Sequence, residues 1–214
     1  AVFLALGWAG WKMYLGRPAT DLVRCSAMLM LGESLRESPR LEEALPVLEA
    51  TLALNRRYWL HDEDLILAAQ SNLSSCLDDL GRRDEALVLK REIYARRVTE
   101  DGVSHLSTIC SGCSLAICLY TNHLLDETTS FSRDLLPVAR RALGADHDLT
   151  LRISYTLAVA LYETPGAARD DLLEAVTMMR DTVRRRRRVF GSAHPLTVQY
   201  EQDMAKFVGA LDSA

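Results

Sequence analysis

The fold is decided by the stretch Asn72-Leu-Ser-Ser-Cys-Leu-Asp-Asp-Leu-Gly-Arg-Arg-Asp-Glu-Ala86. Apolar residues such as Leu73 and Leu77 recur there every three or four positions, which is the spacing of an amphipathic helix. Gly81 ends this helix, and a pair of carboxylates beginning at Asp84 suits the positive dipole end of a second helix. The connection between the two helices is short, so they are expected to form an antiparallel hairpin.

The hairpin recurs along the chain with a period of 42 residues. A leucine or methionine followed by a small residue marks each copy: Leu31-Gly32, Leu73-Ser74, Leu115-Ala116, Leu157-Ala158 and, 47 residues further on, Met204-Ala205. A second series keeps the same intervals: Ala44, Ala86, Thr128 and Ala175. Two series that share one period and one five-residue insertion predict a helical repeat array. The small residues are expected to let the two helices of a hairpin approach closely.

One continuous domain is expected, because each unit of such an array contacts mainly its neighbours. We predict units at about 19–60, 61–104, 105–146 and 147–193, with a terminal helix at 194–214. Residues 1–18 are interpreted as the end of a preceding, degenerate or truncated unit. The linkers repeat a glycine, a histidine and a threonine, as in Gly144, His147 and Thr150. Glycine is expected to end one helix, and Thr or Asp to begin the next.

Composition limits the classes of function. Hydrophobic residues make up 49% of the 214 residues and charged residues 25%, which is ordinary for a globular protein. A formal net charge of −4 provides no general attraction to nucleic acid or to anionic membranes. Five cysteines, an odd number, fit reduced thiols and a cytoplasmic location. The apolar first segment contains Lys12 and is shorter than the ~20 residues of a spanning helix, so no membrane span is expected.

The stretch 72–86, with the helix, the glycine and the His-x-x-Thr linker that follow it, resembles the tetratricopeptide repeat in its 42-residue, kinesin-light-chain-like form. The resemblance covers about residues 16–214. It implies an all-α fold: a right-handed superhelical solenoid of antiparallel helix hairpins, with about four hairpins and a terminal helix. It also implies a concave groove that is lined by the first helix of each hairpin and binds peptide segments of partner proteins.

The resemblance places eight groove candidates on these first helices: Ser71, Asn72, Asp78, Asp79, Tyr120, Arg152, Tyr155 and Tyr162. Helical spacing supports part of the set, because Arg152, Tyr155 and Tyr162 lie on one face of one helix. Aromatic rings beside an arginine suit a peptide with an acidic or aromatic anchor. In kinesin-light-chain-like repeats an asparagine just before the leucine holds the peptide backbone, and here only Asn72 keeps that residue type.

The run Arg184 to Arg188 has two interpretations. Arginines also gather at the end of the second helix of earlier hairpins, where cations suit the negative dipole end and are solvated. Alternatively, Arg184, Arg185, Arg187 and Arg188 form a basic ridge for an acidic partner. Because consecutive residues of a helix point in all directions, the run predicts no nucleic-acid surface.

No motif of catalysis or of metal or cofactor binding is present in the sequence. Four histidines lie in different units and cannot converge on one ion, so they are interpreted as linker hydrogen-bonding groups: His61, His105, His147 and His194. Cys110 and Cys113 lack a second ligand pair and are interpreted as free thiols. We therefore predict no catalytic, cofactor-binding or metal-binding residues, and no enzyme.

The sequence favours a non-catalytic scaffold or adaptor that binds peptide segments of other proteins. One alternative is a regulatory or substrate-docking repeat module of a larger multidomain enzyme. A third hypothesis is a structural array that associates with itself through Met204, Phe207 and Val208 of the last helix. The expected state is a monomer or a weakly self-associating protein.

Overall fold

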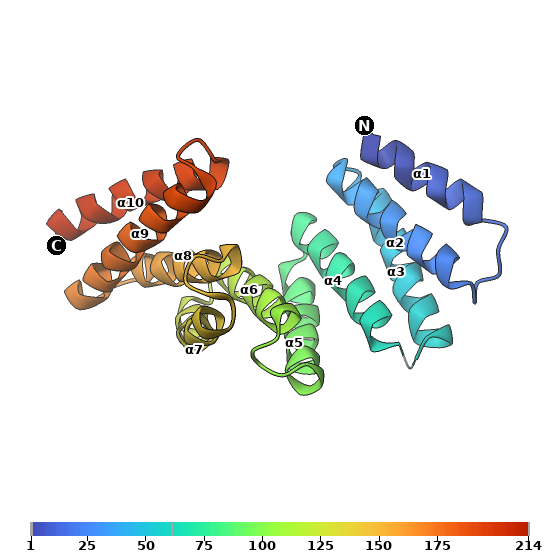
Figure 1. The fold of residues 1–214 in the computed structure, drawn as a ribbon, viewed down its shortest axis with the longest axis horizontal. Coiled ribbons are helices and arrows are strands. Elements are labelled where there is room, and N and C mark those ends of the chain that lie inside the picture. The colour runs from blue at the N-terminus through green and yellow to red at the C-terminus, as the bar shows by residue number, and fades with distance from the viewer. Residues whose placement is uncertain (1, 61, 214) are drawn as a thin grey trace. The chain divides into compact units, whose positions relative to one another are not determined.

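The computed structural model describes residues 2–60 and 62–213, and these residues form α-helices and no strands (Figure 1). The chain divides within one helix into two compact units, Ala1–Ile93 and Tyr94–Ala214. The sequence predicted no boundary at this point. The finer division into repeat units therefore stays a prediction, and each compact unit is described below by itself.

The described residues of unit 1 form α1 (Val2–Tyr14), α2 (Leu22–Glu37), α3 (Leu41–Tyr58), α4 (Glu63–Asp79) and α5 (Arg83–Glu100) as far as Ile93. Consecutive helices from α1 to α4 pack against one another. The connection from α4 to α5 is short, and Gly81 adopts φ +77° within it. That left-handed conformation favours glycine, which explains why the residue ends the helix as predicted.

In unit 2, the end of α5 is followed, as far as residue 213, by α6 (Leu106–Thr121), α7 (Leu125–Leu143), α8 (Asp148–Glu163), α9 (Arg169–Phe190) and α10 (Pro195–Ser213). The predicted five-residue insertion lies in the loop between α8 and α9, where Gly166 has φ +73°. The insertion therefore lengthens a turn and leaves the packing of consecutive helices in place.

Histidines cap α6, α8 and α10, whereas Asp21 and Asp62 cap α2 and α4. The prediction that Thr or Asp begins these helices is therefore confirmed for α2 and α4 and wrong for α6 and α10. The Nδ1 atom of His105 accepts a hydrogen bond from the Ser107 amide at 3.3 Å, and His147 accepts one from the Leu149 amide at 3.2 Å. His194 does the same at the start of α10, at 3.2 Å. An imidazole nitrogen thus satisfies one of the amide groups that a helix start leaves unpaired. His61 lies outside the described residues.

Small residues hold positions of close approach between helices. A Cβ atom added to Gly32 of α2 would lie 2.5 Å from the Cδ2 atom of Leu48 in α3. In unit 2, a Cβ atom on Gly112 would lie 2.8 Å from Leu135 Cδ2 and 3.0 Å from the ring of Tyr94. Neither position has room for a larger side chain without displacement of its neighbour.

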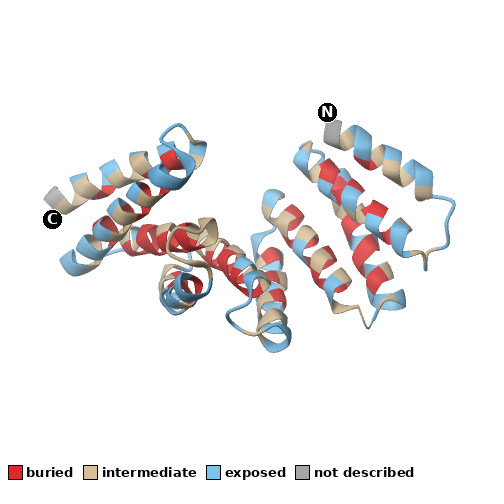
Figure 2. Ribbon diagram, viewed as in Figure 1, coloured by how far each residue is buried: buried red, intermediate tan, exposed pale blue. Residues whose placement is uncertain are grey.

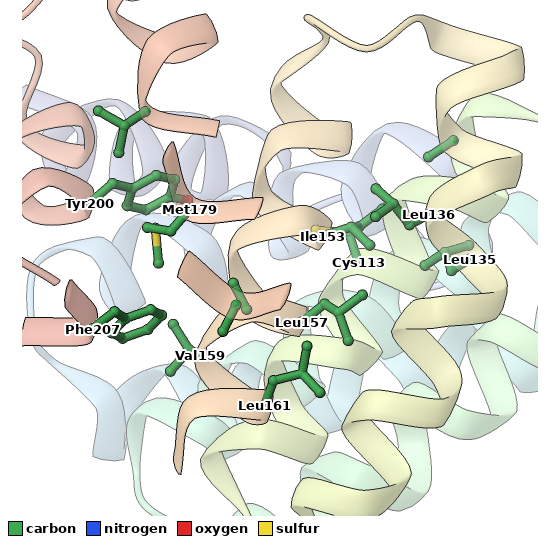
Figure 3. Close-up of a cluster of buried hydrophobic side chains, with 14 of the residues drawn as sticks. Cys113, Leu135, Leu136, Ile153, Leu157, Val159, Leu161, Met179, Tyr200 and Phe207 are labelled. Carbon is green, nitrogen blue, oxygen red and sulfur yellow. The ribbon is translucent and has the colours of Figure 1, made fainter. Parts of the chain in front are cut away.

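The core of unit 2 lies along α8, which packs against α6, α7 and α9 and is buried over most of its length (Figure 2). Figure 3 shows Ile153, Leu157 and Leu161 of α8 among side chains of the neighbouring helices. Tyr200 and Phe207 of α10 belong to the same cluster (Figure 3). Because this core is continuous from α6 to α10, it holds the polar side chains of α8 in fixed positions.

Candidate functional site

A cavity of about 450 Å³ lies in unit 2 between α6, α8 and α10. These are the first helices of consecutive hairpins, the elements that were predicted to line a groove. The lining residues are Ile117, Tyr120 and Thr121 of α6, Arg152, Tyr155, Thr156 and Val159 of α8, and Leu196, Gln199 and Tyr200 of α10. Three of the predicted site residues, Tyr120, Arg152 and Tyr155, are therefore brought together at one cavity.

Arg152 supplies the positive charge of this cavity. Its side chain is half-buried, and no carboxylate forms an ion pair with it among the residues that the structure describes. Tyr120, Tyr155 and Tyr200 contribute the aromatic part of the lining. The site therefore combines an uncompensated guanidinium with aromatic rings, an arrangement that attracts a carboxylate or another ring.

Hydrogen bonds and stacking fix the tyrosine walls. Tyr155 donates from its hydroxyl to Asp203 Oδ2 at 2.7 Å, and its ring stacks on Tyr200 with centroids 3.8 Å apart. Tyr120 donates to Glu163 Oε1 at 2.9 Å. Burial, and then the bond to Glu163, raise the pKa of Tyr120 to about 12, while burial raises the pKa of Tyr200 to about 12. All three rings are thus neutral and held in place near neutral pH.

Tyr162 does not line the cavity. Its ring stacks on Phe207 of α10, with centroids 4.1 Å apart and planes 14° from parallel. The contact joins Tyr162 to the apolar cluster of unit 2. Tyr162, which was predicted to line the groove, therefore packs against the apolar cluster instead of lining the cavity.

The other four predicted residues lie on α4 of unit 1. Asp78 forms an ion pair with the buried Lys90, and Asp79 pairs with Arg36 at 2.9 Å. The backbone oxygen of Ser71 accepts hydrogen bonds from the hydroxyls of two serines of the same helix, and the Ser71 side chain is exposed. Asn72 is half-buried. Both carboxylates thus have partners within unit 1, and whether these four residues bind a partner protein stays a prediction.

The arginine run of α9 is largely compensated by carboxylates of unit 2. The pairs are Arg184 and Arg185 with Asp181, Arg185 and Arg188 with Asp146, Arg186 with Asp148, and Arg187 with Glu201. Hydrogen bonds from Arg185, together with the charge of Arg188, lower the pKa of Asp146. Arg186 is only 1% exposed, and its guanidinium lies 4.6 Å from the Phe190 ring centroid and 5.1 Å from that of Tyr200. The arginine run therefore includes a buried side chain, Arg186, that packs in unit 2, as well as arginines that are ion-paired nearer the surface.

Other candidate chemistry is sparse. None of the five cysteines forms a disulfide, and Cys110 is exposed while Cys113, one turn away, is buried. No group of three or more His, Cys, Asp or Glu within residues 2–60 and 62–213 is placed to hold a metal ion. Nowhere in the described part of the chain is a helix long and apolar enough to cross a membrane.

Comparison with known proteins agrees with this architecture. The model of the tetratricopeptide repeat family matches residues 167–196. The nearly identical TPR-like repeats of a kinesin-light-chain-type protein from Podosopora anserina superpose with a TM-score of 0.72 at 19% identity, over 86% of this chain and 85% of that one. BtubC (BKLC) from P. vanneervenii has a TM-score of 0.76 at 14% identity, over 99% of this chain and 85% of that one.

A Rap protein complexed with competence and sporulation factor is also similar, with a TM-score of 0.62 at 14% identity, over 98% of this chain and 59% of that one. No curated protein sequence gives a significant match. The chain thus has the all-α helix-hairpin fold of tetratricopeptide repeats. More particularly, its fold is that of kinesin-light-chain-type repeats, which confirms the resemblance inferred from the sequence.

The three cavity residues of α10, Leu196, Gln199 and Tyr200, were not among the predicted candidates. Tyr200 stands three residues after Thr197, and Ile153 stands three residues after Thr150. The repeat register therefore predicts a core side chain at Tyr200, which is indeed buried. Only the packing of α10 beside α8 shows that the same ring also borders the cavity.

Proposed function

We propose that this protein is a non-catalytic interaction scaffold or adaptor that binds a peptide segment of a partner protein in the cavity between α6, α8 and α10. The observation that supports this function best is the environment of Arg152. Its guanidinium lines an aromatic cavity and forms no ion pair within the described residues. An acidic side chain of a peptide would supply the missing carboxylate, and an aromatic one would stack on the tyrosines.

The fixed walls of the cavity favour binding. Tyr155 is held by Asp203 and Tyr200, and Tyr120 is held by Glu163. Side chains that are already ordered lose little conformational entropy when a ligand arrives. The similar Rap protein was solved in complex with competence and sporulation factor, so a protein of this fold is known with a bound factor.

The thiols support a reducing compartment for this function. Five cysteines are present and none is in a disulfide. We propose a cytoplasmic adaptor on this basis, because exposed thiols such as that of Cys110 persist where glutathione and thioredoxin keep them reduced.

The experiment is a selection of random linear peptides on the purified full-length chain and on two variants. Arg152→Gln removes the cavity charge, whereas Arg141→Gln removes an exposed charge of α7 that does not line the cavity. We expect the wild-type protein and Arg141→Gln to enrich the same peptides, with Asp, Glu or aromatic residues at one position. Arg152→Gln should lose that enrichment. Identical peptides on all three proteins would overturn the assignment of the cavity.

A further inference from the structure

We propose that unit 2 holds a second binding site, for a phosphate group carried by a side chain of a partner protein. The site is a cavity of about 210 Å³ between α7, α8 and α9. Its lining residues are Arg140, Ala145, Thr150, Leu151, Ser154, Asp181, Thr182 and Arg185. One water molecule needs only roughly 15 Å³, so the cavity can take an anion of several atoms.

One buried side chain of this cavity has a hydroxyl group whose hydrogen-bonding capacity the protein leaves unused. Thr150 is 1% exposed, and its hydroxyl has no hydrogen-bond partner among the described residues. Of its repeat equivalents, Thr108 donates to the backbone oxygen of Arg97 at 3.1 Å, whereas the hydroxyl of Thr197 also has no partner among the described residues. Thr150 lines the cavity, so a turn of its side chain would let an anion bound there accept the hydrogen bond that the protein leaves unmade.

Two more hydroxyls lie at the same cavity. Ser154 and Thr182 are buried, and their hydroxyl oxygens are 2.9 Å apart, close enough for one to donate to the other. Their bond uses one of their two hydrogens, so the second hydroxyl can donate to a ligand. The cavity thus offers hydroxyl donors from both α8 and α9.

The charges near the cavity favour an anion. A neighbouring cavity of about 550 Å³ shares Arg140 and Asp181 with it and is also lined by Thr177, Met178, Arg180 and Arg184. The linings of the two cavities together hold four arginines and one aspartate, a formal charge of +3. Asp181 already accepts from Arg184 and Arg185, whereas Arg140 and Arg180 form no ion pair in the described part of the chain.

The number of donors favours phosphate over carboxylate. A carboxylate has two oxygens, whereas a phosphate monoester has three terminal oxygens and nearly two charges at neutral pH. Arg185 already donates to Asp181 and Asp146, but Arg140, the remaining N–H groups of Arg185 and the hydroxyls together still provide more donors than a carboxylate can accept. The larger neighbouring cavity, with Met178 in its lining, provides room for the chain that carries the phosphate. A phosphorylated side chain therefore fits the pair of cavities better than a free ion.

This site is independent of the proposed function. The phosphate cavity and the Arg152 cavity both use α8, but they share no lining residue. A peptide could therefore bind at either one alone, and failure of one proposal leaves the other standing.

The probe is a labelled Gly-Gly-phosphoserine-Gly-Gly peptide, with its unphosphorylated form and inorganic phosphate as competitors, and the readout is fluorescence anisotropy on the full-length chain. We expect the phosphorylated peptide to bind at least about tenfold more tightly than the unphosphorylated one, and more tightly than inorganic phosphate. Arg140→Gln and Thr150→Val should each weaken it about fivefold or more. Arg141→Gln, an exposed neighbour on α7, and Arg152→Gln should change it less than about twofold.

Three results would overturn the proposal. Equal binding of both peptides would remove the phosphate specificity. Equal weakening by Arg140→Gln and Arg141→Gln would show only general attraction to positive charge. Tighter binding of inorganic phosphate would leave a free-anion site and exclude a protein-borne ligand. Because Thr150 is buried, circular dichroism must confirm that its variant is folded, whereas Arg140 is exposed and its substitution tests the site regardless.

Discussion

Replacement of Arg186 by methionine should destabilise unit 2, although Arg186 lies in a run of surface-type residues. Arg186 is 1% exposed and donates from Nη1 to Asp148 Oδ1 at 2.8 Å. A hydrogen bond between charged groups contributes about 1.5–3 kcal/mol. The contacts with Phe190 and Tyr200 each add roughly 0.5–2 kcal/mol. Methionine keeps part of the packing, so the free energy of unfolding is expected to fall by about 2–4 kcal/mol.

The partner substitution distinguishes a buried pair from ordinary packing. Asp148→Ala leaves the Arg186 cation buried without its carboxylate, and breaking a buried pair in this way costs about 3–5 kcal/mol. The double variant, Arg186→Met with Asp148→Ala, leaves no uncompensated charge. Its loss of unfolding free energy should therefore be smaller than the sum of the two single losses by about 1–3 kcal/mol. Arg184→Met is the matched control, since the Arg184 side chain is 77% exposed and its pair with Asp181 should contribute less than about 1 kcal/mol.

Urea unfolding of the full-length chain, followed by far-ultraviolet circular dichroism, measures these free energies. All three tryptophans, Trp8, Trp11 and Trp59, lie in unit 1, so an unchanged tryptophan emission spectrum would show that unit 1 stays folded in each variant. Equal losses of unfolding free energy in Arg186→Met and Arg184→Met would refute the buried pair. So would a loss in the double variant that equals the sum of the losses of Arg186→Met and Asp148→Ala.

Three further predictions follow from local packing and burial. Gly112→Val should lower the free energy of unfolding by about 1–3 kcal/mol in urea unfolding, because its Cβ would meet Leu135. Gly209→Ala should be neutral or stabilising, since a Cβ atom added there would have no neighbouring atom within 4 Å. Thiol labelling of the folded protein should modify the exposed Cys110 before the buried Cys113, because burial raises the pKa of Cys113 to about 11. Because the folded-state pKa of Tyr200 is raised from 10.0 to about 12, its contribution to stability should be complete below pH 10 and lost as pH rises towards 12. A Tyr200→Phe variant should lose less stability over that pH interval, and an equal loss would contradict the assignment to Tyr200.

The sequence predicts the helices well because their spacing, their glycine ends and the 42-residue period are local properties of the chain. Leu73, Leu77 and Gly81 identify α4 and its end without reference to any other helix. The capping histidines are less predictable, because Ser, Thr, Asp and Asn are the usual capping residues. His147 caps α8 through a ring nitrogen, a role that its position between glycine and threonine only suggests.

The candidate site depends on packing between helices, which a single repeat does not encode. Helical spacing places Arg152 and Tyr155 on one face, but it does not show that Tyr200 closes the other side of the cavity. Arg186 looks like its four neighbours in sequence and differs from them only because it points between Phe190 and Tyr200. The partners of Arg186 lie on three helices, with Asp148 on α8, Phe190 on α9 and Tyr200 on α10, and their identity is set by how these helices pack.

The most direct test of the peptide-binding cavity is a charge swap between Arg152 and an acidic residue of a peptide selected on the wild-type protein. Dissociation constants are measured for the four combinations of wild-type or Arg152→Glu protein with the acidic or lysine-substituted peptide. Each single change should weaken binding, and the combined change should restore it, with a coupling free energy of about 1.5 kcal/mol or more. Losses that simply add, with no recovery in the swapped pair, would contradict the claim that Arg152 receives the peptide.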